Sequence, residues 1–332
     1  MRNTILIFIC VFAMSFNTKA QDGFEEIILA GEKDAEILLE GYFAPAMEGF
    51  IYAMNNGWAH TAKVHKTLGF DLTIGASGAL VPSSKEIFTA TGLTHNNGSY
   101  TGPTLMGEGD GGTYTVTKDN DEVSIDMPGG ITEDLPINAV PAPTVQLNVG
   151  LPFKLEAMVR FFPETDFGDD GGSAKMLGLG LKKEITSWFG PLDKLPLHVS
   201  LLASYTTLNV NYGFGDYTES EPDLTVENGA AEFDLKAINV QALASLNFPF
   251  INVYGGIGYG SGDSNFKMNG TYTYNKDGDN EEILTAPDLK FSAAGFKTTI
   301  GARISLGFFK IFADYTLQEY NAVSAGIAFS IR

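Results

Sequence analysis

The feature that most constrains this chain is a long, strict alternation of apolar residues with other residue types. From Val145 to Phe161 every odd-numbered position is apolar, and the even-numbered positions between them are polar, charged, Gly or Pro, apart from Met158. Successive side chains of a β-strand point to opposite faces, so the alternation predicts a strand with one wholly apolar face. Soluble strands usually run about 5–6 residues, which is shorter than this segment. We therefore expect a strand that crosses a membrane with its apolar face toward lipid.

The same period recurs along most of the chain from residue 67. The further alternating segments are Thr67–Leu80, Ala174–Ser187, Leu197–Tyr212, Ala231–Phe248, Phe250–Phe266, Asp288–Phe308, Lys310–Gln318 and Asn321–Arg332. Three connections are short (188–196, 247–250 and 306–310), and three are acidic and Gly-rich (162–173, 213–230 and 267–287). Short turns at one end and long loops at the other are typical of an outer-membrane β-barrel.

Closed single-chain barrels of this kind have an even number of strands, and nine segments are clear. We therefore predict an all-β, transmembrane antiparallel barrel of about ten strands, with a range of eight to fourteen. The missing strand is expected in 81–143, because the other connections are too short for one. Ser84–Leu93 is the better candidate, since Thr113–Lys118 and Glu122–Met127 look like a small separate hairpin around Asp119–Asp121.

Composition agrees with a lipid-facing β-protein and excludes some partners. Aromatic residues make up 12% of the chain, charged residues 18%, and there are 38 glycines. The formal net charge of −19 argues against nucleic acid as a partner, because phosphate binding needs a basic face. No run of apolar residues is long enough for a transmembrane helix, which leaves a closed barrel as the spanning architecture. The alternative is a secreted, soluble β-sandwich.

Residues 1–20 are predicted to be a cleaved signal peptide. Arg2 precedes the apolar run 5–14, and Thr18 and Ala20 supply small residues at the cleavage positions. The alternative is a buried N-terminal helix of a cytosolic protein. Cys10 is the sole cysteine, so the mature chain has none, which excludes disulfides and thiol chemistry. We expect export to the bacterial outer membrane, with a plug or cap over 21–65 and a multi-pass barrel over 66–332, notably with a long loop at 82–142.

Residues 24–54 form the one stretch with helical periodicity. Its apolar residues follow three- and four-residue spacing, and Pro45 predicts two helices that meet near 43–45. Asn55–Gly57 is a stop signal. An apolar stripe of this kind needs a cover, so we expect a plug or periplasmic cap packed on the barrel, with a tethered soluble helix pair as the alternative. The stripe includes Met47, Phe50 and Met54.

Several charged residues fall on the inward phase of the predicted strands. Lumen or gate candidates are Lys154, Glu156, Arg160, Lys297, Arg303 and Asp314. The interior of a barrel of eight to ten strands is nearly filled by side chains, so charges of both signs there should pair. Such pairs indicate a plugged or gated interior. They serve either as structural cross-braces or as a polar gate that contacts a ligand.

The sequence offers little for catalysis or metal binding. His198 and Ser200 share a strand face, but no third partner is assignable, so we expect no enzyme activity and no catalytic residue. Three acidic stretches, 119–122, 166–172 and 277–282, have oxygen ligands of the kind that Ca²⁺ prefers. We interpret them as solvated loop tips and predict no metal site and no cofactor. Lipopolysaccharide or outer-membrane lipid is the expected surrounding partner.

The stretch Tyr42–Leu80, with "NNGW" and "HKTLGFDL", resembles the start of an uncharacterised family of outer-membrane barrels. That family is distantly similar to the long-chain fatty-acid transporter (FadL-like) barrels, and the likeness extends loosely to 141–160 and 312–332. The resemblance implies an N-terminal plug and passive transport or binding of a small hydrophobic or amphipathic ligand. The alternative is a structural or adhesion barrel without transport. The chain ends in Ile331-Arg332 rather than an aromatic residue, although Phe329 can take that role.

Overall fold

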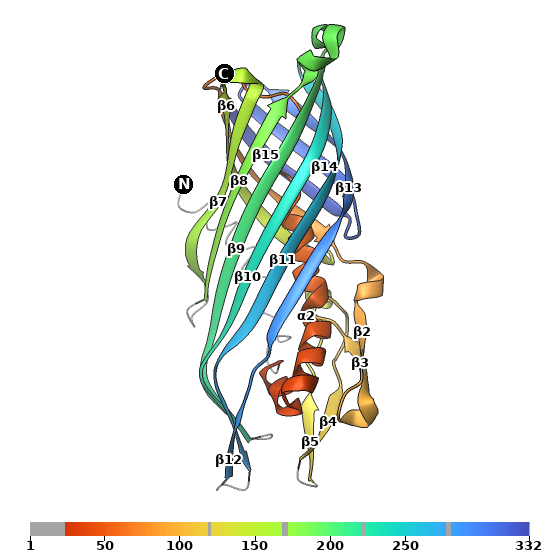
Figure 1. Cartoon of the computed structure of the whole chain (residues 1–332), viewed down its shortest axis with the longest axis vertical. Coiled ribbons are helices and arrows are strands. Elements are labelled where there is room, and N and C mark those ends of the chain that lie inside the picture. The colour runs from red at the N-terminus through yellow and green to blue at the C-terminus, as the bar shows by residue number, and fades with distance from the viewer. Residues whose placement is uncertain (1–23, 119–120, 168–171, 221–222, 277–279, 332) are drawn as a thin grey trace.

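Ten strands close into a single antiparallel barrel. The computed structural model describes residues 24–118, 121–167, 172–220, 223–276 and 280–331, and nothing further is said of the remainder, which includes the predicted signal peptide. Neighbouring strands pair antiparallel around the ring, and β1 closes it between β6 and β15 (Figure 1). The ring strands are β1 (Phe70–Leu80), β6 (Ala139–Leu151), β7 (Leu155–Phe167), β8 (Gly172–Glu184), β9 (Leu197–Ser220), β10 (Asp223–Asn247), β11 (Ile251–Lys276), β13 (Asp288–Leu306), β14 (Phe309–Leu317) and β15 (Ala322–Ile331).

The predicted strand number is confirmed, but the location of the tenth strand was wrong. The long alternating segment is a hairpin of β6 and β7, with a turn at Pro152–Lys154. Residue pairs across this hairpin, such as Leu151 with Leu155, have the same parity. The apolar residues therefore remain at odd-numbered positions on both sides of the turn, and the alternation does not show where the turn lies. Pro152 was the one local signal, because a Pro rarely lies inside a central strand.

The outer wall is apolar, as the alternation predicted. Exposed aliphatic side chains follow every second position of the strands, for example Leu177, Leu179 and Leu181 on β8. Ile300 and Ile304 continue this surface on β13. Positions between them face the interior and are small or polar. This is the distribution that a barrel in lipid requires.

All three long connections are strand extensions at most of their described residues, and in the first of them 162–167 belongs to β7 and 172–173 to β8. The predicted loops over 213–230 and 267–287 are mostly the far ends of β9, β10 and β11, and β12 (Asn280–Leu284) pairs with β11. Their inner face carries buried apolar side chains, such as Leu224, Val226 and Tyr272. These side chains pack into the same apolar core as the N-terminal helix. That core explains why a polar, Gly-rich stretch stays in strand form.

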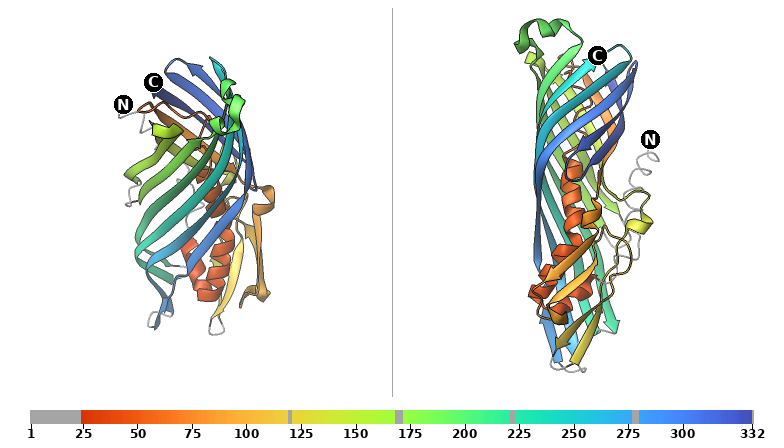
Figure 2. Two further views of the ribbon diagram at one scale, coloured as in Figure 1. Left: turned by 45° about the horizontal axis from the view of Figure 1, so that its top comes forward. Right: turned by 90° about the vertical axis from the view of Figure 1, so that its right-hand side faces the viewer.

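Residues 81–138, apart from the undescribed 119–120, form a small head beside the long hairpins. Ser84–Leu93 is not a barrel strand: its strand β2 (Ile87–Thr91) pairs only with β3 (Ser99–Pro103). The predicted small hairpin is confirmed as β4 (Thr113–Lys118) and β5 (Asp121–Asp126). Figure 2 shows both strand pairs outside the ring, next to the helix. Ile125 and Tyr114 are fully buried there.

The N-terminal segment is one helix rather than two. A short 3-10 helix, η2 (Phe24–Ala30), precedes α2 (Glu32–Met54), which continues through Pro45. Pro45 lacks the N–H that would bond to the Gly41 carbonyl, a cost of about 3 kcal/mol in an exposed helix. Here α2 is buried on most sides, so packing outweighs the lost bond. No helix among the described residues is long and apolar enough to cross a membrane.

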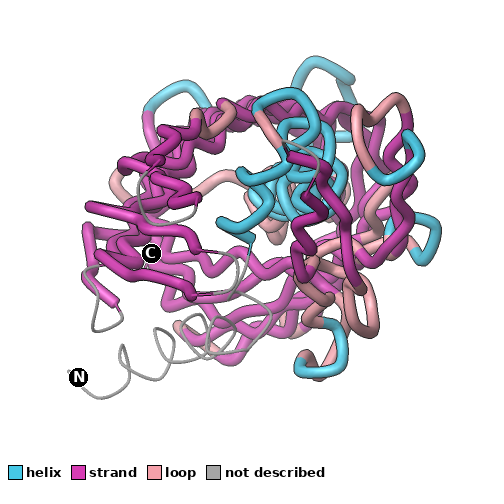
Figure 3. The backbone as a smooth tube through the Cα atoms, turned by 90° about the horizontal axis from the view of Figure 1, so that it is seen from below, coloured by secondary structure: helices cyan, strands magenta, loops and turns pink. Residues whose placement is uncertain are grey.

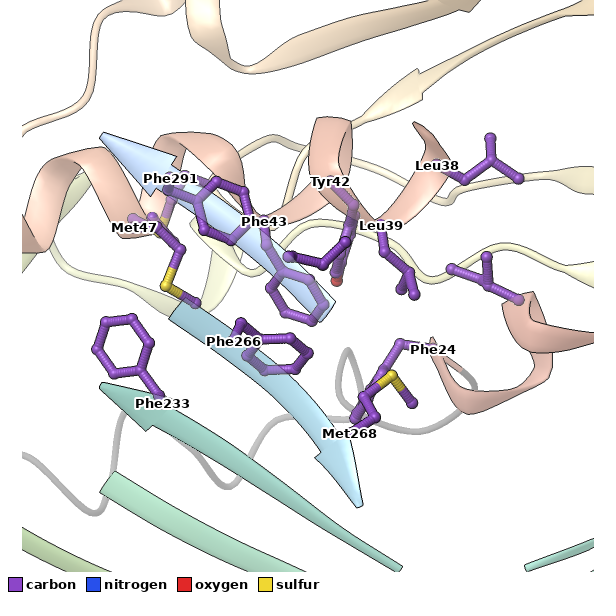
Figure 4. Close-up of a cluster of buried hydrophobic side chains, with 14 of the residues drawn as sticks. Phe24, Leu38, Leu39, Tyr42, Phe43, Met47, Phe233, Phe266, Met268 and Phe291 are labelled. Atoms are coloured by element: carbon purple, nitrogen blue, oxygen red, sulfur yellow. The ribbon is translucent and has the colours of Figure 1, made fainter. Parts of the chain in front are cut away.

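The helix lies at the long-hairpin end, not at the short-turn end where a periplasmic cap would be. Figure 3 looks into this end and shows α2 within the outline of the strands. Phe43 packs on Phe266 of β11 with ring centroids 4.7 Å apart, and Met47 lies between Phe233 and Phe291 (Figure 4). Beyond Met54 the chain continues to the short-turn end, where β1 begins beside the end of β15.

A buried carboxylate ties the start of α2 to the head. The two carboxylate oxygens of Asp34 accept hydrogen bonds from the backbone N–H groups of Thr94 (2.9 Å) and His95 (3.1 Å) and from the hydroxyl of Tyr114 (2.8 Å). Burial opposes ionisation of Asp34, but these hydrogen bonds outweigh it and hold the pKa of its carboxyl below the ordinary value.

Replacing Asp34 should therefore loosen the head. We expect Asp34→Asn to lower the free energy of head opening by about 1.5–3 kcal/mol, the range for a hydrogen bond to a charged group. The measurement is hydrogen exchange of the β4 and β5 amides, with exposed Glu122→Gln as the control. Because the folded pKa lies below the unfolded one, the wild-type advantage is complete above about pH 4 and is lost as pH falls through the folded value. Equal protection in both variants would contradict this role.

The direction of the chain through the barrel gives a second test. In outer-membrane barrels the short turns face the periplasm, so the start of α2 should face the cell exterior. Cys10 is the sole cysteine of the sequence, so a single introduced cysteine can be labelled with the unchanged protein as the background control. We expect Glu36→Cys to react with a membrane-impermeant maleimide on intact cells. Phe153→Cys, in the exposed turn between β6 and β7, should react only after the outer membrane is broken. The reverse labelling pattern would show that the barrel has the opposite orientation in the membrane.

Candidate functional site

The barrel interior is occupied by the chain that follows the helix. We call residues 55–68, between α2 and β1, the lumen segment. Its contacts reach strands on opposite sides of the ring, including β8, β10, β11, β13 and β14. Gly57 has φ +68°, a conformation that suits glycine, and lies directly after the helix stop. The predicted stop at Asn55–Gly57 is confirmed by the end of α2 at Met54.

Two cations from the wall bind the carbonyl end of α2. Arg160 on β7 donates to the carbonyls of Met54 and Asn56 (both 3.2 Å), and Lys297 on β13 donates to the Asn55 carbonyl at 2.6 Å. The last carbonyls of a helix lack partners within it and carry partial negative charge. Arg160 and Lys297 are both buried, so these bonds compensate charge as well as hydrogen-bonding capacity.

Trp58 fills the interior just beyond the helix. Its indole N–H donates to the Met54 carbonyl at 3.2 Å, and the Arg160 guanidinium lies 4.2 Å from the ring centroid. The six-membered ring of the indole packs against Gly178 and Gly180 of β8, where an added Cβ would come within 2.9 Å of the ring. The two glycines are alternate inward positions of one strand and make a slot for the indole. Trp58 thus forms a floor across part of the lumen.

Nearer the short-turn end the lumen segment is held by a network of side chains. Glu156 on β7 pairs with Lys182 on β8 at 2.6 Å and accepts a hydrogen bond from the backbone N–H of His65 at 2.9 Å. The Val64 N–H donates to Glu184, and the Lys182 ammonium donates to the Thr61 carbonyl. The segment is therefore bound through its backbone by three wall residues.

His60 lies between these two levels. Its ring stacks on Phe312 with centroids 4.8 Å apart, and its Nδ1 lies 3.0 Å from the Arg303 guanidinium. Since Arg303 can only donate, His60 Nδ1 is the acceptor and the opposite ring nitrogen faces Asp71 at 3.6 Å.

The structure places most of the predicted lumen charges inside, but it does not pair them with one another. Asp314 accepts a hydrogen bond from the Tyr254 hydroxyl (2.9 Å), and Glu156 forms an ion pair with Lys182, which is not one of the six candidates. Lys154 is the exception in position, since it lies in the turn after β6, is half exposed and reaches Glu184 at 3.6 Å. The inward phase was assigned to Lys154 on the assumption of one continuous strand, which the turn interrupts.

The wall itself is incomplete between β6 and β7. Their ladder joins Gln146–Leu151 to Leu155–Arg160 and stops there, while β6 continues along β1 to Leu80 and β7 continues along β8. Even-numbered residues at both ends of β6 bond toward β1: Gly150 N donates to Gly69 O, and Asn138 O accepts from Val81 N. Odd-numbered positions therefore point their backbone groups toward β7.

Two prolines occupy the odd positions at this edge. Pro141 and Pro143 have no N–H, so the edge of β6 that faces β7 lacks two of the donors a ladder would need. β7 carries Pro163 and a register shift between Phe162 and Thr165. The sequence thus encodes the separation of the two strands. Because β1 has only 11 residues, about one membrane span, the gap lies in the half of the span nearer the long hairpins.

A cavity of about 230 Å³ occupies this gap. Ile74, Val145 and Ile327, whose side chains lie on the outer face of the wall, line one side of it. Phe50 and Met54 of the helix line the other. The remaining lining residues are Pro141, Ala142, Pro143, Thr144, Phe162, Ala174, Met176 and Leu208. The lining has no charged side chain, and it joins the lipid-facing surface to the barrel interior.

Of the predicted helix residues, Phe50 and Met54 line this cavity, and Met47 packs elsewhere in the apolar core. The sequence reasoning missed Trp58 and the proline pair. The P-x-P spacing of Pro141 and Pro143 inside an alternating segment was the available signal, because it removes donors from one edge of a strand only.

The residues considered for other chemistry do not assemble into a reactive centre. His198 Nδ1 lies 3.1 Å from Glu184, but the buried Ser200 hydroxyl makes no hydrogen bond within the described part of the chain. In that part there is also no group of three or more His, Cys, Asp or Glu residues placed to hold a metal ion. The acidic positions 119–120, 168–171 and 277–279 lie outside the described residues.

Loosening the lumen segment should open the barrel to ions. We expect Lys297→Met to raise single-channel conductance in planar bilayers several-fold, because it removes the bond to the Asn55 carbonyl while preserving most of the side-chain volume. Exposed Lys175→Met on β8 is the matched control and should conduct like the wild type. Unchanged conductance in a correctly folded Lys297→Met protein would show that other contacts hold the segment in place.

Comparisons with known proteins give a family but no function. No curated protein matches the sequence. Among solved structures the chain is similar to the attachment invasion locus protein Ail of Yersinia pestis (11% identity, 80% of this chain and 99% of that chain, TM-score 0.26). It is also similar to the translocator domain of the autotransporter NalP from Neisseria meningitidis (11%, 81% and 90%, 0.32). A third is the Ralstonia pickettii toluene transporter TbuX (10%, 91% and 98%, 0.23).

These similarities are weak, so the barrel fold is assigned from the strand pairings of the chain itself. The family comparison is specific: residues 1–331 match the model of a family of unknown function, DUF6588. This confirms the expected membership in an uncharacterised family, and the match extends over almost the whole sequence. The chain belongs to the DUF6588 family.

Proposed function

We propose that this outer-membrane barrel takes small apolar molecules from the outer half of the bilayer through the gap between β6 and β7, and releases them toward the periplasm past the lumen segment. The transfer is passive. Export through cleavage of residues 1–20 is part of the same proposal. The transport proposal is supported by the uncharged cavity, which is lined by side chains from both faces of the wall.

The cavity lining favours an apolar ligand. Phe50, Met54 and Met176 offer aromatic and thioether surface, and Thr144 is the sole polar side chain of the lining. A dry apolar cavity of about 150 Å³ binds benzene, so one of 230 Å³ suits about ten carbon atoms. Such a molecule partitions into lipid first, and an entrance at the level of the membrane meets it there.

The route onward is closed in this conformation. Trp58 and Arg160 lie beyond Met54, on the side of the short turns, and the bonded lumen segment follows. Release therefore requires residues of this segment to shift. The bonds that hold it run mostly from wall side chains to its backbone carbonyls and amides, so a shift exchanges hydrogen bonds without taking apart the ring.

An adhesion or display barrel is the second candidate. The long hairpins and the head favour it, because they extend far beyond the membrane-spanning rows and carry much of the chain's acidic charge. A display barrel has no need for a wall gap with a cavity behind it. The two functions therefore differ in the effect of filling that cavity.

Filling the cavity is the direct test. Ala174 of β8 is buried and lines the cavity, so Ala174→Phe should place a ring in it. Ala203 of the neighbouring strand β9 is exposed on the outer wall, so Ala203→Phe is the matched control. We expect Ala174→Phe to reduce the initial accumulation of radiolabelled naphthalene by expressing cells about tenfold, a difference of ~1.4 kcal/mol. The control should stay at the wild-type rate.

Each outcome decides between the two functions. Equal accumulation in cells with and without the wild-type barrel would reject transport and favour display. Transport that is unaffected by Ala174→Phe would reject the gap as the entrance. Surface amounts of each variant, measured by labelling of Glu36→Cys, provide the normalisation.

A further inference from the structure

Cations from three elements gather at the short-turn mouth of the barrel without carboxylate partners of their own. Arg303 of β13 is buried, Lys310 of β14 lies near the end of its strand, and Lys63 of the lumen segment is exposed. In the β13–β14 ladder Arg303 pairs with Phe312 and Ser305 pairs with Lys310, so Arg303 and Lys310 lie two residues apart along neighbouring strands. Arg303 also contacts His60 of the lumen segment at 3.0 Å, and Lys63 of that segment acts electrostatically on Lys310. Within the described residues none of the three forms an ion pair.

The nearby carboxylates contact other groups, although Asp71 Oδ2 makes no hydrogen bond within the described residues. Glu156 is paired with Lys182 at 2.6 Å and contacts His65 at 2.7 Å. Asp71 accepts a hydrogen bond from the Asn148 amide and lies 3.3 Å from His65. With Glu156 and Lys182 cancelling, Arg303, Lys310 and Lys63 face one carboxylate, Asp71. The mouth is therefore positively charged in a chain whose formal net charge is −19.

Arg303 has a donor that no group of the described residues uses. Its side chain is 7% exposed, and its Nε makes no hydrogen bond, while one of its terminal nitrogens contacts His60. A buried guanidinium N–H without an acceptor is costly, and an anionic oxygen is the acceptor that a guanidinium binds best.

We propose that Arg303, Lys310 and Lys63 form an anion-binding site at the periplasmic mouth, for a phosphate or carboxylate group. The group belongs either to a small free anion or to a lipid headgroup. Arg303 supplies the buried N–H, and the two lysines supply further positive charge. The site is independent of the apolar cavity and does not rest on the transport function.

Binding of inorganic phosphate by the full-length protein tests the site. The protein is kept in a maltoside detergent, which carries no phosphate, and titrated by calorimetry. We expect Lys310→Gln and Lys63→Gln each to weaken phosphate binding about tenfold, as the loss of a charge-assisted contact requires. Lys175→Gln, on the outer wall, is the matched control and should bind like the wild type. Acetate should compete with phosphate.

A competition experiment distinguishes a lipid headgroup from a small free anion. Competition of phosphate by phosphatidylglycerol in the same detergent would identify a lipid headgroup, and its absence would identify a free anion. No phosphate or acetate binding by the wild type, or equal binding by Lys310→Gln, Lys63→Gln and Lys175→Gln, would overturn the proposal. Lys63 is exposed and Lys310 is partly exposed, and neither forms an ion pair within the described residues, so these variants leave the buried network intact.

Discussion

In lipid every backbone N–H and C=O must find its partner inside the protein, and the rest of this structure depends on how the ring of strands meets that demand. The ladder meets it around most of the ring. Between β6 and β7 it stops, and there Pro141 and Pro143 remove donors that would otherwise be left unpaired in the membrane. A break in the wall is tolerable at this place because the chain has fewer polar groups to satisfy. The apolar cavity has the same cause, because Pro141 and Pro143 keep β6 and β7 apart and line the space between them.

The interior is governed by a related demand. A helix that ends inside a barrel leaves carbonyls without partners, and Arg160 and Lys297 satisfy them from the wall. This is why the lumen charges do not pair with one another as expected. The prediction counted strand residues against strand residues and left out the chain that passes between them. Once the lumen segment is inside, its backbone offers acceptors nearer to these cations than the opposite wall does.

The fold was largely predictable because alternation is a local property. The apolar outer wall, the β4–β5 hairpin and most of the strands follow from patterns within single segments, whereas the number ten came from the rule that such barrels have an even number of strands. The wrong predictions also have physical causes. The turn between β6 and β7 leaves the apolar residues on odd-numbered positions, so the alternation did not reveal the hairpin. Tertiary burial kept α2 continuous through Pro45. Inner-face packing against α2 turned polar stretches into the ends of β9, β10 and β11.

What the sequence determined by itself is the membrane-facing surface, because the apolar side chains at every second position allow only one face of each strand to meet lipid. It also contained the proline pair that weakens one edge. Only the tertiary structure decided that Trp58 lies in a slot of two glycines, that α2 enters from the long-hairpin end, and that Arg303 and Lys310 lie on neighbouring strands beside the lumen segment. These arrangements join residues far apart in the chain, and no local period records which strands face each other across a closed ring.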